Sequence, residues 1–415
     1  MMTALSTALT GLDAASTAVS IVGNNLANLN TTGYKDESVQ FSDIMSQALG
    51  SGSTGTQIGL GVGPAQAVTS YTQGTIQQTS GAYDAAIDGN GFFVVQDQNN
   101  QQLYTRDGAF SLNSAGDLVT ASGDAVQGWN MTGGTVNTNS PTTSIVVPEG
   151  GTMAPVPTAT MSLTVNLDSA ATVGDSSGTY STPIQVVDSQ GGTHTLTATF
   201  TMTGSNTWSY AITVPAADLK TGGTTSLATG TLTFDGTGQL TSPDAKTSPI
   251  AIKLSGLADG ASDMTVNWNL YNGTQGLLTQ FNQASSVSAA TQDGIQAGQV
   301  NSVSLANGGL IVATYSNGQQ VTVGQVALAN IANPETLVGV GGNNLQATAA
   351  TAVPAIGTAG TGGRGQIMGG SLESSTVDIA TEFTSLISYE RTYQANSRMI
   401  TTSDQMIQDL IGLIR

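Results

Sequence analysis

Residues 24–37 read NNLANLNTTGYKDE, and this stretch decides the fold because a long helical pattern stops inside it. Asn, Thr and Gly are residues that satisfy backbone groups at helix ends and form turns. The apolar residues keep a helical spacing up to Leu29, inside this stretch. The stretch therefore predicts a junction between an N-terminal helix and the rest of the chain.

The apolar residues before this junction step by three and four in strict alternation, which is a coiled-coil seam. The seam consists of Leu5, Ala8, Leu12, Ala15, Val19, Val22, Leu26 and Leu29. Residues 4–30 are expected to form a helix about 40 Å long. Asp13 is the only charged residue up to Tyr34, whereas a solvated helix face normally carries Lys and Glu. We expect this helix to be surrounded by protein in a multimer, although packing on its own domain alone would also explain the seam.

The C-terminal stretch mirrors this pattern. Apolar residues recur there at steps of three, four or whole heptads: Ile379, Phe383, Leu386, Tyr389, Tyr393, Ile400, Ile407, Leu410 and Ile414. Residues 377–414 are expected to form a helix about 57 Å long. The stretch has no Pro, and no Gly before Gly412, so nothing obvious interrupts the helix.

The composition limits the number of domains and the classes of partner and chemistry that the chain can have. A chain of 415 residues exceeds the size of a single core, so several domains are expected. With 9 Lys and Arg against 27 Asp and Glu, the chain lacks the clustered cations that nucleic acid requires, and nucleic acid is not expected as a partner. The absence of Cys excludes disulfides and thiol chemistry. No apolar run is judged long enough to span a membrane, and no cleavable signal peptide is recognised.

Between the two helices, short alternating segments separated by Gly, Asn and Asp predict β-strands. We predict a multidomain α+β fold, with a terminal α-helical coiled-coil inner domain and two mainly-β domains nested by insertion. The expected parts are a helical inner domain at 1–30 and 372–415, linkers at 31–75 and 356–371, an inner β domain at 76–147 and 286–355, and an outer β domain at 148–285.

The sequence offers only weak signals for a catalytic or ligand-binding site. His194, the only histidine, alternates with threonines and fits a sheet face or turn edge better than a general base. Asp84, Asp88 and Asn90 lack the spacing and the closing Glu of a calcium loop. Arg106 and Asp107 are adjacent, and either an interface role or a solvated local pair fits them. We expect no enzyme, no catalytic residue, no cofactor and no metal.

Four blocks carry a family resemblance: "NNLANLNTTGYK" with Phe41; "GNGFF", "YTRDGAF" and "GDLVT"; "QVALANIANPETL"; and "LESSTVDIATEFTSLISYERTYQANSRMITTSDQMIQDLIGLI". Together they resemble the bacterial flagellar axial proteins, the family of rod and hook subunits. The long Thr/Gly-rich insertion between about 148 and 285 favours a hook-type member. The family usually has Ser-Asn-Val-Asp where this chain has residues 375–378, and Gln where it has Glu390.

The resemblance implies a structural subunit that polymerises head to tail into a flexible, curved tube, which encloses an export channel and transmits torque from rod to filament. Its partners would be further copies of itself, other axial proteins (distal rod, hook cap, hook–filament junction) and the export apparatus, without membrane insertion. It would lie outside the cell, in the hook and basal body, and be exported without a cleaved signal peptide. The junction residues would satisfy the helix end, Gly33 would reverse the chain, and Tyr34 would anchor a neighbour.

The expected assembly interface follows from both seams and the junction. It comprises Leu5, Leu12, Val19, Val22, Leu26, Leu29, Asn25, Asn28, Asn30, Thr31, Gly33, Tyr34, Phe383, Leu386, Tyr393, Ile400, Ile407, Leu410 and Ile414. Two alternatives remain open. The chain could be a distal rod-type axial protein, or a surface β-adhesin in which Trp208 and Tyr210 form a carbohydrate-binding face.

Overall fold

The computed structural model describes residues 2–44, 47–49, 56–132, 135–148 and 150–413. The chain divides into two compact units. The first, which we call the helix-bearing unit, contains residues 1–149, 302–313 and 320–415. The second, which we call the sandwich unit, contains residues 150–301 and 314–319. The described fold is mainly β, with one α-helix near each end of the chain.

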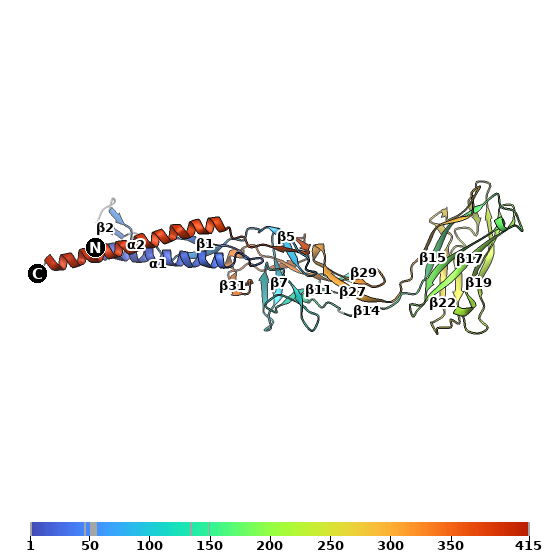
Figure 1. Cartoon of the computed structure of the whole chain (residues 1–415), viewed down its shortest axis with the longest axis horizontal. Coiled ribbons are helices and arrows are strands. Elements are labelled where there is room, and N and C mark those ends of the chain that lie inside the picture. The colour runs from blue at the N-terminus through green and yellow to red at the C-terminus, as the bar shows by residue number, and fades with distance from the viewer. Residues whose placement is uncertain (1, 45–46, 50–55, 133–134, 149, 414–415) are drawn as a thin grey trace. The chain divides into compact units, whose positions relative to one another are not determined.

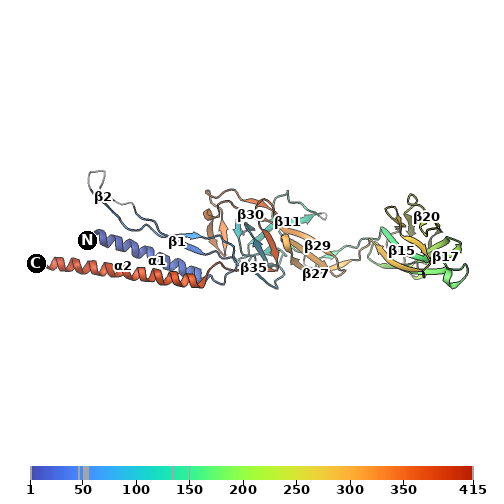
Figure 2. The same ribbon diagram turned by 90° about the horizontal axis from the view of Figure 1, so that it is seen from above.

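The two helices confirm the expected helical ends. Helix α1 spans Met2–Ala27 and helix α2 spans Ile379–Leu413. They pack side by side and run in opposite directions (Figures 1 and 2). By length and hydropathy, Leu5–Ala27 would be able to span a membrane, so the expectation that no such run exists was wrong. Core helices of soluble proteins pass the same test, and α1 packs on α2.

Residues 31–75, expected to be a linker, contain paired strands. These are β1 (Glu37–Gln40), β2 (Gln47–Leu49), β3 (Thr56–Ile58) and β4 (Gln66–Thr69). Strand β1 pairs antiparallel with β4, and β2 pairs with β3, so the segment runs out and returns along itself. The Phe41 ring packs edge-on against Tyr389 of α2, with 6.0 Å between ring centroids. The segment thus contacts the helix pair.

The β part of the helix-bearing unit is built from both halves of the chain. Its large sheet runs β27-β28-β29-β11-β7-β8-β32-β31, and the short strand β14 (Thr152–Met153) pairs with β27 at the end of this order. Strands from the N-terminal half are β5 (Ile76–Gln78), β6 (Ala85–Asp88), β7 (Phe92–Gln96), β8 (Gln102–Thr105), β9 (Ser111–Leu112), β10 (Leu118–Val119), β11 (Ala125–Thr132), β12 (Thr135–Val136) and β13 (Thr143–Ser144). Strands from the C-terminal half are β27 (Gly298–Leu305), β28 (Leu310–Tyr315), β29 (Gln320–Val326), β30 (Leu328–Asn330), β31 (Val338–Gly341), β32 (Asn344–Gln346), β33 (Ala355–Gly357), β34 (Gln366–Gly369) and β35 (Ser371–Glu373). The short helices η3 (Asn307–Gly309) and η4 (Pro334–Thr336) lie among the latter.

Two short pairings lead from this β part to α2. Strand β34 pairs with β6, and β35 pairs with β5. The C-terminal segment is therefore held by backbone hydrogen bonds up to Glu373, six residues before α2 begins.

The sandwich unit contains two five-stranded sheets with a common core. One sheet runs β21-β22-β15-β25, with β26 also paired to β15, and the other runs β16-β17-β18-β19-β20. The strands are β14 (Thr152–Met153), β15 (Thr160–Asp168), β16 (Thr179–Val187), β17 (Thr193–Gly204), β18 (Thr207–Thr213), β19 (Ser226–Phe234), β20 (Leu240–Ser242), β21 (Ile250–Leu254), β22 (Met264–Asn269), β23 (Tyr271–Asn272), β24 (Gln275–Gly276), β25 (Leu278–Phe281) and β26 (Ser286–Gln292), with short helices η1 (Ser176–Gly178) and η2 (Ala216–Asp218).

Alternation explains the sandwich core. Along β15 and β18 every second side chain is buried, as a strand with one covered face requires. Trp208 and Trp268 are fully buried, and the Tyr210 ring packs edge-on against Trp268 at 5.3 Å. Trp208 and Tyr210 are therefore core residues, and the binding face suggested for them in the adhesin alternative was wrong.

Candidate assembly site

The junction after α1 is shaped by a glycine. Gly33 has φ +67°, a region that L side chains rarely adopt, and a Cβ there would stand 2.6 Å from the backbone carbon of Arg106. Its N–H donates to the carbonyl of Glu373, 2.8 Å away. The predicted reversal is confirmed, and it brings the chain leaving α1 against the chain entering α2.

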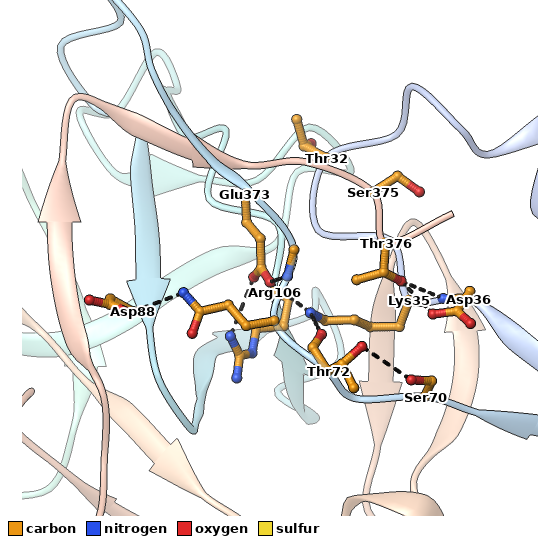
Figure 3. A network of polar contacts seen from close by, with 12 residues as sticks. Thr32, Lys35, Asp36, Ser70, Thr72, Asp88, Arg106, Glu373, Ser375 and Thr376 are labelled. Carbon is orange, nitrogen blue, oxygen red and sulfur yellow. Dashed lines mark hydrogen bonds and ion pairs between the residues drawn. The ribbon is translucent and has the colours of Figure 1, made fainter. Parts of the chain in front are cut away.

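A buried ion cluster of Lys35, Arg106 and Glu373 lies next to this reversal, since Lys35 follows Gly33 by two positions (Figure 3). Glu373 Oε1 is 2.7 Å from Lys35 Nζ, and Oε2 is 3.3 Å from the Arg106 guanidinium. All three side chains are buried. The carboxylate also accepts the N–H of Gly74, Lys35 donates to the carbonyl of Thr72, and Arg106 donates to a further backbone carbonyl. The cluster joins four segments that are distant in sequence.

Burial dominates the electrostatics of both cations. It lowers the pKa of Lys35, and the hydrogen bond and charge of Glu373 oppose this shift. Burial likewise lowers the pKa of Arg106, again against the effect of Glu373. Arg106 is buried and pairs with Glu373, while the Asp107 carboxylate accepts the hydroxyl of Thr32 at 2.6 Å. The expectation of a solvated local pair was therefore wrong, and the interface role stays a prediction.

Asn25 is the central polar residue of the helix end, and it is fully buried. Its amide donates to the carbonyl of Glu37 at 2.8 Å and to the Glu382 carboxylate of α2 at 2.9 Å. Its side-chain oxygen accepts the N–H of Glu37 and the hydroxyl of Tyr34. Burial, followed by the charges of Glu37 and other acids nearby, raises the pKa of Tyr34 to about 12. Asn25 thus fixes α1, the reversal and α2 together.

The other junction residues have smaller roles within the chain. Asn28 donates to the backbone carbonyl of Asn24, as expected at a helix end. Thr31 donates to the side chain of Asn28, whereas Asn30 is exposed. The role of Tyr34 as an anchor for a neighbouring subunit stays a prediction, since its hydroxyl is bonded within its own chain.

Helix α1 buries a stripe of small residues rather than the large members of the predicted seam. The buried residues are Ala8, Ala14, Ala15, Ala18, Ile21, Val22 and Asn25. A Cβ on Gly11 would meet the Asn396 side chain of α2 at 2.8 Å, so the helices approach closely along this stripe. Of the named interface residues, Val22 and Asn25 lie in the stripe. The half-buried ones are Leu5, Leu12, Val19, Leu26 and Leu29. The Leu9 side chain is 58% exposed, and Leu9 was not among the residues of the predicted seam.

Helix α2 leaves much of its apolar surface uncovered. Phe383 is 51% exposed and Tyr393 is exposed, while Leu386, Ile400 and Ile407 are half-buried. The side chain of Leu410 and the whole of Ile414 lie outside the described residues. Further exposed apolar residues, which the seam did not include, are Ile387, Met399, Met406 and Ile411.

Two open grooves flank the junction. One, of about 470 Å³, is lined by Leu29, Asn30 and Thr31 after α1 and by residues 372–375 before α2. The other, of about 350 Å³, is lined by Asn28, Gly33 and Tyr34 together with residues 341–345. Of the junction residues named from sequence, Asn28, Asn30, Thr31, Gly33 and Tyr34 therefore line accessible grooves, whereas Asn25 is buried.

The sequence did not predict that Lys35, Arg106 and Glu373 would come together in one cluster. The only signal in the sequence was the scarcity of cations, with 9 Lys and Arg in the chain, since a cation that becomes buried needs an anionic partner. It did not reveal their partner. His194 lies near the start of β17, on the buried face of its sheet, as the expectation of a sheet-face residue requires. Burial acts to lower its pKa, but hydrogen bonds and charges from Asp188 and Asp218 outweigh this and raise it.

Four models of flagellar protein families match separate stretches of the chain. Family models match residues 5–35 (flagella basal body rod protein), 86–173 (flagellar hook protein FlgE/F/G D1 domain), 164–295 (flagellar basal body protein FlaE D2 domain) and 368–413 (flagellar basal body rod FlgEFG protein C-terminal).

Full-length relatives agree with these models. The chain is 34% identical to the flagellar hook protein FlgE of Escherichia coli over 422 residues, which is 99% of this chain and 100% of that protein. It is 33% identical to the flagellar hook protein FlgE of Salmonella typhimurium, over 98% of this chain and 99% of that protein. It is also 33% identical to that of Borreliella burgdorferi, over 100% of both. Because this similarity extends from one end of the chain to the other, the chain belongs to the flagellar hook protein family.

Proposed function

We propose that this chain is a structural subunit of the bacterial flagellar hook, and that copies of it polymerise through the helix pair into a flexible, curved tube. The full-length relatives named hook protein support this over a rod-type role. The family is a structural one, not a class of enzyme. The observation that carries the assembly mechanism is the large apolar side chains left exposed on both helices.

The exposed apolar surface supplies a driving force for assembly. Full burial of a large apolar side chain contributes about 1.5–3 kcal/mol, and residues such as Phe383, Ile387 and Ile411 are about half exposed. Several of these per subunit, covered by neighbouring helices, would offset the entropy lost on association. Small neutral side chains at Ser16 and Ser20 allow those neighbours to approach closely.

In this proposal the helix pairs form the inner tube around the export channel, as a coiled-coil-like helical layer, and the inserted β domains lie further out. Neighbouring copies add in an open helical array. The buried cluster at Glu373 would transmit torque between the helices and the β part, because four segments are fixed to one another there. The other partners would be the axial proteins at either end of the hook and the export apparatus, and export would proceed without a cleaved signal peptide.

The test combines two substitutions in α1, Leu12→Asp and Leu26→Asp. Both side chains are half-buried in the single chain, so the charges can reach water in the monomer, whereas burial at a subunit contact would cost several kcal/mol. We expect a folded monomer by circular dichroism and no tubes by negative-stain electron microscopy under salting-out.

The matched control is Leu12→Met with Leu26→Met, which conserves volume and apolarity and should still form tubes. Normal tubes from the Asp variant would contradict the role of this surface.

A further inference from the structure

Three acidic side chains from separate segments of the sandwich unit surround its single histidine. His194 is near the start of β17, Asp188 follows β16, Asp218 ends η2, and Asp259 lies between β21 and β22. The Nε2 atom of His194 is 2.9 Å from Asp188 Oδ2 and 3.4 Å from Asp259 Oδ2. Its Nδ1 atom is 3.3 Å from Asp218 Oδ2. One imidazole thus faces three carboxylates.

In both Asp188 and Asp259, the Oδ1 oxygen accepts backbone N–H groups. Asp188 Oδ1 accepts the backbone N–H groups of Gln190 and Gly192, at 2.7 and 2.9 Å. Asp259 Oδ1 accepts the N–H of Ala261 at 3.0 Å. A Cβ built on Gly192 would stand 2.6 Å from Asp188 Oδ2 and 3.2 Å from Asp259 Oδ2, so the two Oδ2 oxygens approach the same place. The backbone hydrogen bonds to Oδ1 therefore leave both Oδ2 oxygens facing Nε2, and Asp188 Oδ2 is itself hydrogen-bonded to Nε2.

We propose that Nε2 of His194 and the Oδ2 atoms of Asp188 and Asp259 bind a divalent transition-metal ion, a site that the sequence did not lead us to expect. The three atoms lie within 4.8 Å of one another. Ligands at about 2.0–2.2 Å from a metal stand roughly 3 Å apart, which agrees with the two distances from Nε2.

A second observation supports a bound cation. The His194 side chain is buried, and its Nδ1 has no hydrogen bond of good geometry, yet it faces Asp218. Metal-binding histidines commonly direct their second nitrogen to a carboxylate, which fixes the tautomer and ring orientation. Asp218 is placed for that role. Since the Asp259 side chain is 36% exposed, water can reach the site and complete the coordination shell.

The donor set favours Zn²⁺ and its first-row neighbours over Ca²⁺ and Mg²⁺. Imidazole nitrogen suits the former, whereas the latter prefer an all-oxygen shell. Binding would join the turn after β16 to the loop after β21, which already touch where the N–H of Ser262 donates to Ser189. The ion would act as a structural crosslink between the two sheets of the sandwich unit.

The experiment uses the untagged full chain, freed of metal with a chelator and titrated with Zn²⁺ by calorimetry. We expect one ion per chain, with Mg²⁺ failing to compete, and a rise in the thermal unfolding temperature. X-ray absorption should show a single imidazole in the coordination shell, and it must be His194 because the chain has no other histidine.

Variants locate the site independently. His194→Gln and Asp259→Asn should each weaken Zn²⁺ binding by about tenfold or more. The matched control is Asp235→Asn, since Asp235 also accepts backbone N–H groups two and four residues ahead in the same unit but lies outside the cluster; it should leave the affinity unchanged.

Two outcomes would overturn the proposal. Both variants must first unfold like the wild type in the absence of metal. If their Zn²⁺ affinity is then unchanged, the ion binds elsewhere. Failure of the wild-type chain to bind Zn²⁺, or absorption spectra without imidazole, would mean that a protonated His194 alone holds the three carboxylates.

Discussion

Glu373 is the residue on which the helix-bearing unit depends most. Its carboxylate is buried between Lys35 and Arg106, and its backbone carbonyl holds Gly33. One residue thus neutralises two buried cations and fixes the reversal after α1. A buried ion pair is not in itself strong evidence of stabilisation, but removing one partner leaves uncompensated charge.

Glu373→Gln is therefore expected to destabilise the helix-bearing unit by about 3–5 kcal/mol, since it leaves two buried cations without their anion. Urea unfolding, followed by the circular dichroism of the two helices, measures the loss. Glu390→Gln serves as control, because Glu390 is exposed on α2 and bonds only Gln394 there. It should change stability by no more than about 0.5 kcal/mol. Equal effects of the two substitutions would refute the importance of the cluster.

At the scale of elements, α2 is attached through its N-terminus. Asp378 precedes the helix and accepts the N–H of Thr381 at 2.7 Å, while Thr376 exchanges hydrogen bonds with Asp36 on the N-terminal side of the chain. Residues 375–378 depart from the family's usual sequence, yet a cap and a link to the N-terminal segment are both formed. The start of α2 is thereby fixed to the chain that leaves α1.

The cap at Asp378 makes the start of α2 sensitive to acid. The hydrogen bond from the Thr381 backbone lowers the pKa of Asp378 below its ordinary value. A carboxylate with a lowered pKa stabilises the fold above its unfolded pKa, and this contribution is lost as the pH falls through the lower, folded pKa. Hydrogen-exchange protection of the first turn of α2 should therefore decrease as the pH is brought below about 4.

Asp378→Asn tests this cap, because Asn caps helices comparably without a charge to lose. Its protection factors, corrected for intrinsic exchange, should depend less on pH than those of the wild type. Asp404→Asn, far from the start of the same helix, should behave like the wild type. An unchanged acid response in Asp378→Asn would show that another group controls the first turn.

At the scale of the whole molecule, the chain enters and leaves the sandwich unit at neighbouring positions. The backbones of Val156 and Ile295 form a bridge, with both N–H to carbonyl distances at 2.8 Å. This agrees with the expectation that an inserted domain has adjacent ends. Strand β26, at residues 286–292, pairs with β15 of the same unit, so the compact unit extends beyond residue 285. The division of the polymer into nested inner and outer domains remains a prediction.

Replacement of residues 157–294 by a short Gly-Ser bridge should leave the helix-bearing unit folded, because the bridged ends are already adjacent. Tubes should still form, since the proposed contacts lie on α1 and α2, but they should be thinner and lose their regular curvature. Removal of residues 1–30 should have the opposite effect, giving folded β-sheets and no tubes. Negative-stain images and a thermal melt of each variant measure both results. Tubes from the N-terminal truncation, with none from the internal deletion, would reverse the assignment of assembly to the helices.

The sequence by itself determined the elements, because their signals are local. A helical period of three and four residues placed α1 and α2 to within a few residues, alternation and Gly-rich turns indicated the β-strands, and Gly33 was recognised from the residues around it. The same local patterns, with the resemblance they carry, were enough to indicate the family.

Only the tertiary structure decided which residues meet. Lys35 and Glu373 are 338 positions apart, and no periodicity predicts such a pair. The predicted seam of α1 included Leu5, Leu12, Leu26 and Leu29, which are only half-buried. Gly11, outside that seam, lies against the Asn396 side chain of α2, because a residue without a side chain lets two backbones approach closely. The histidine cluster likewise depends on three loops that fold to one point. Local patterns report which face of an element is apolar, whereas the partner of that face is set by packing across the whole chain.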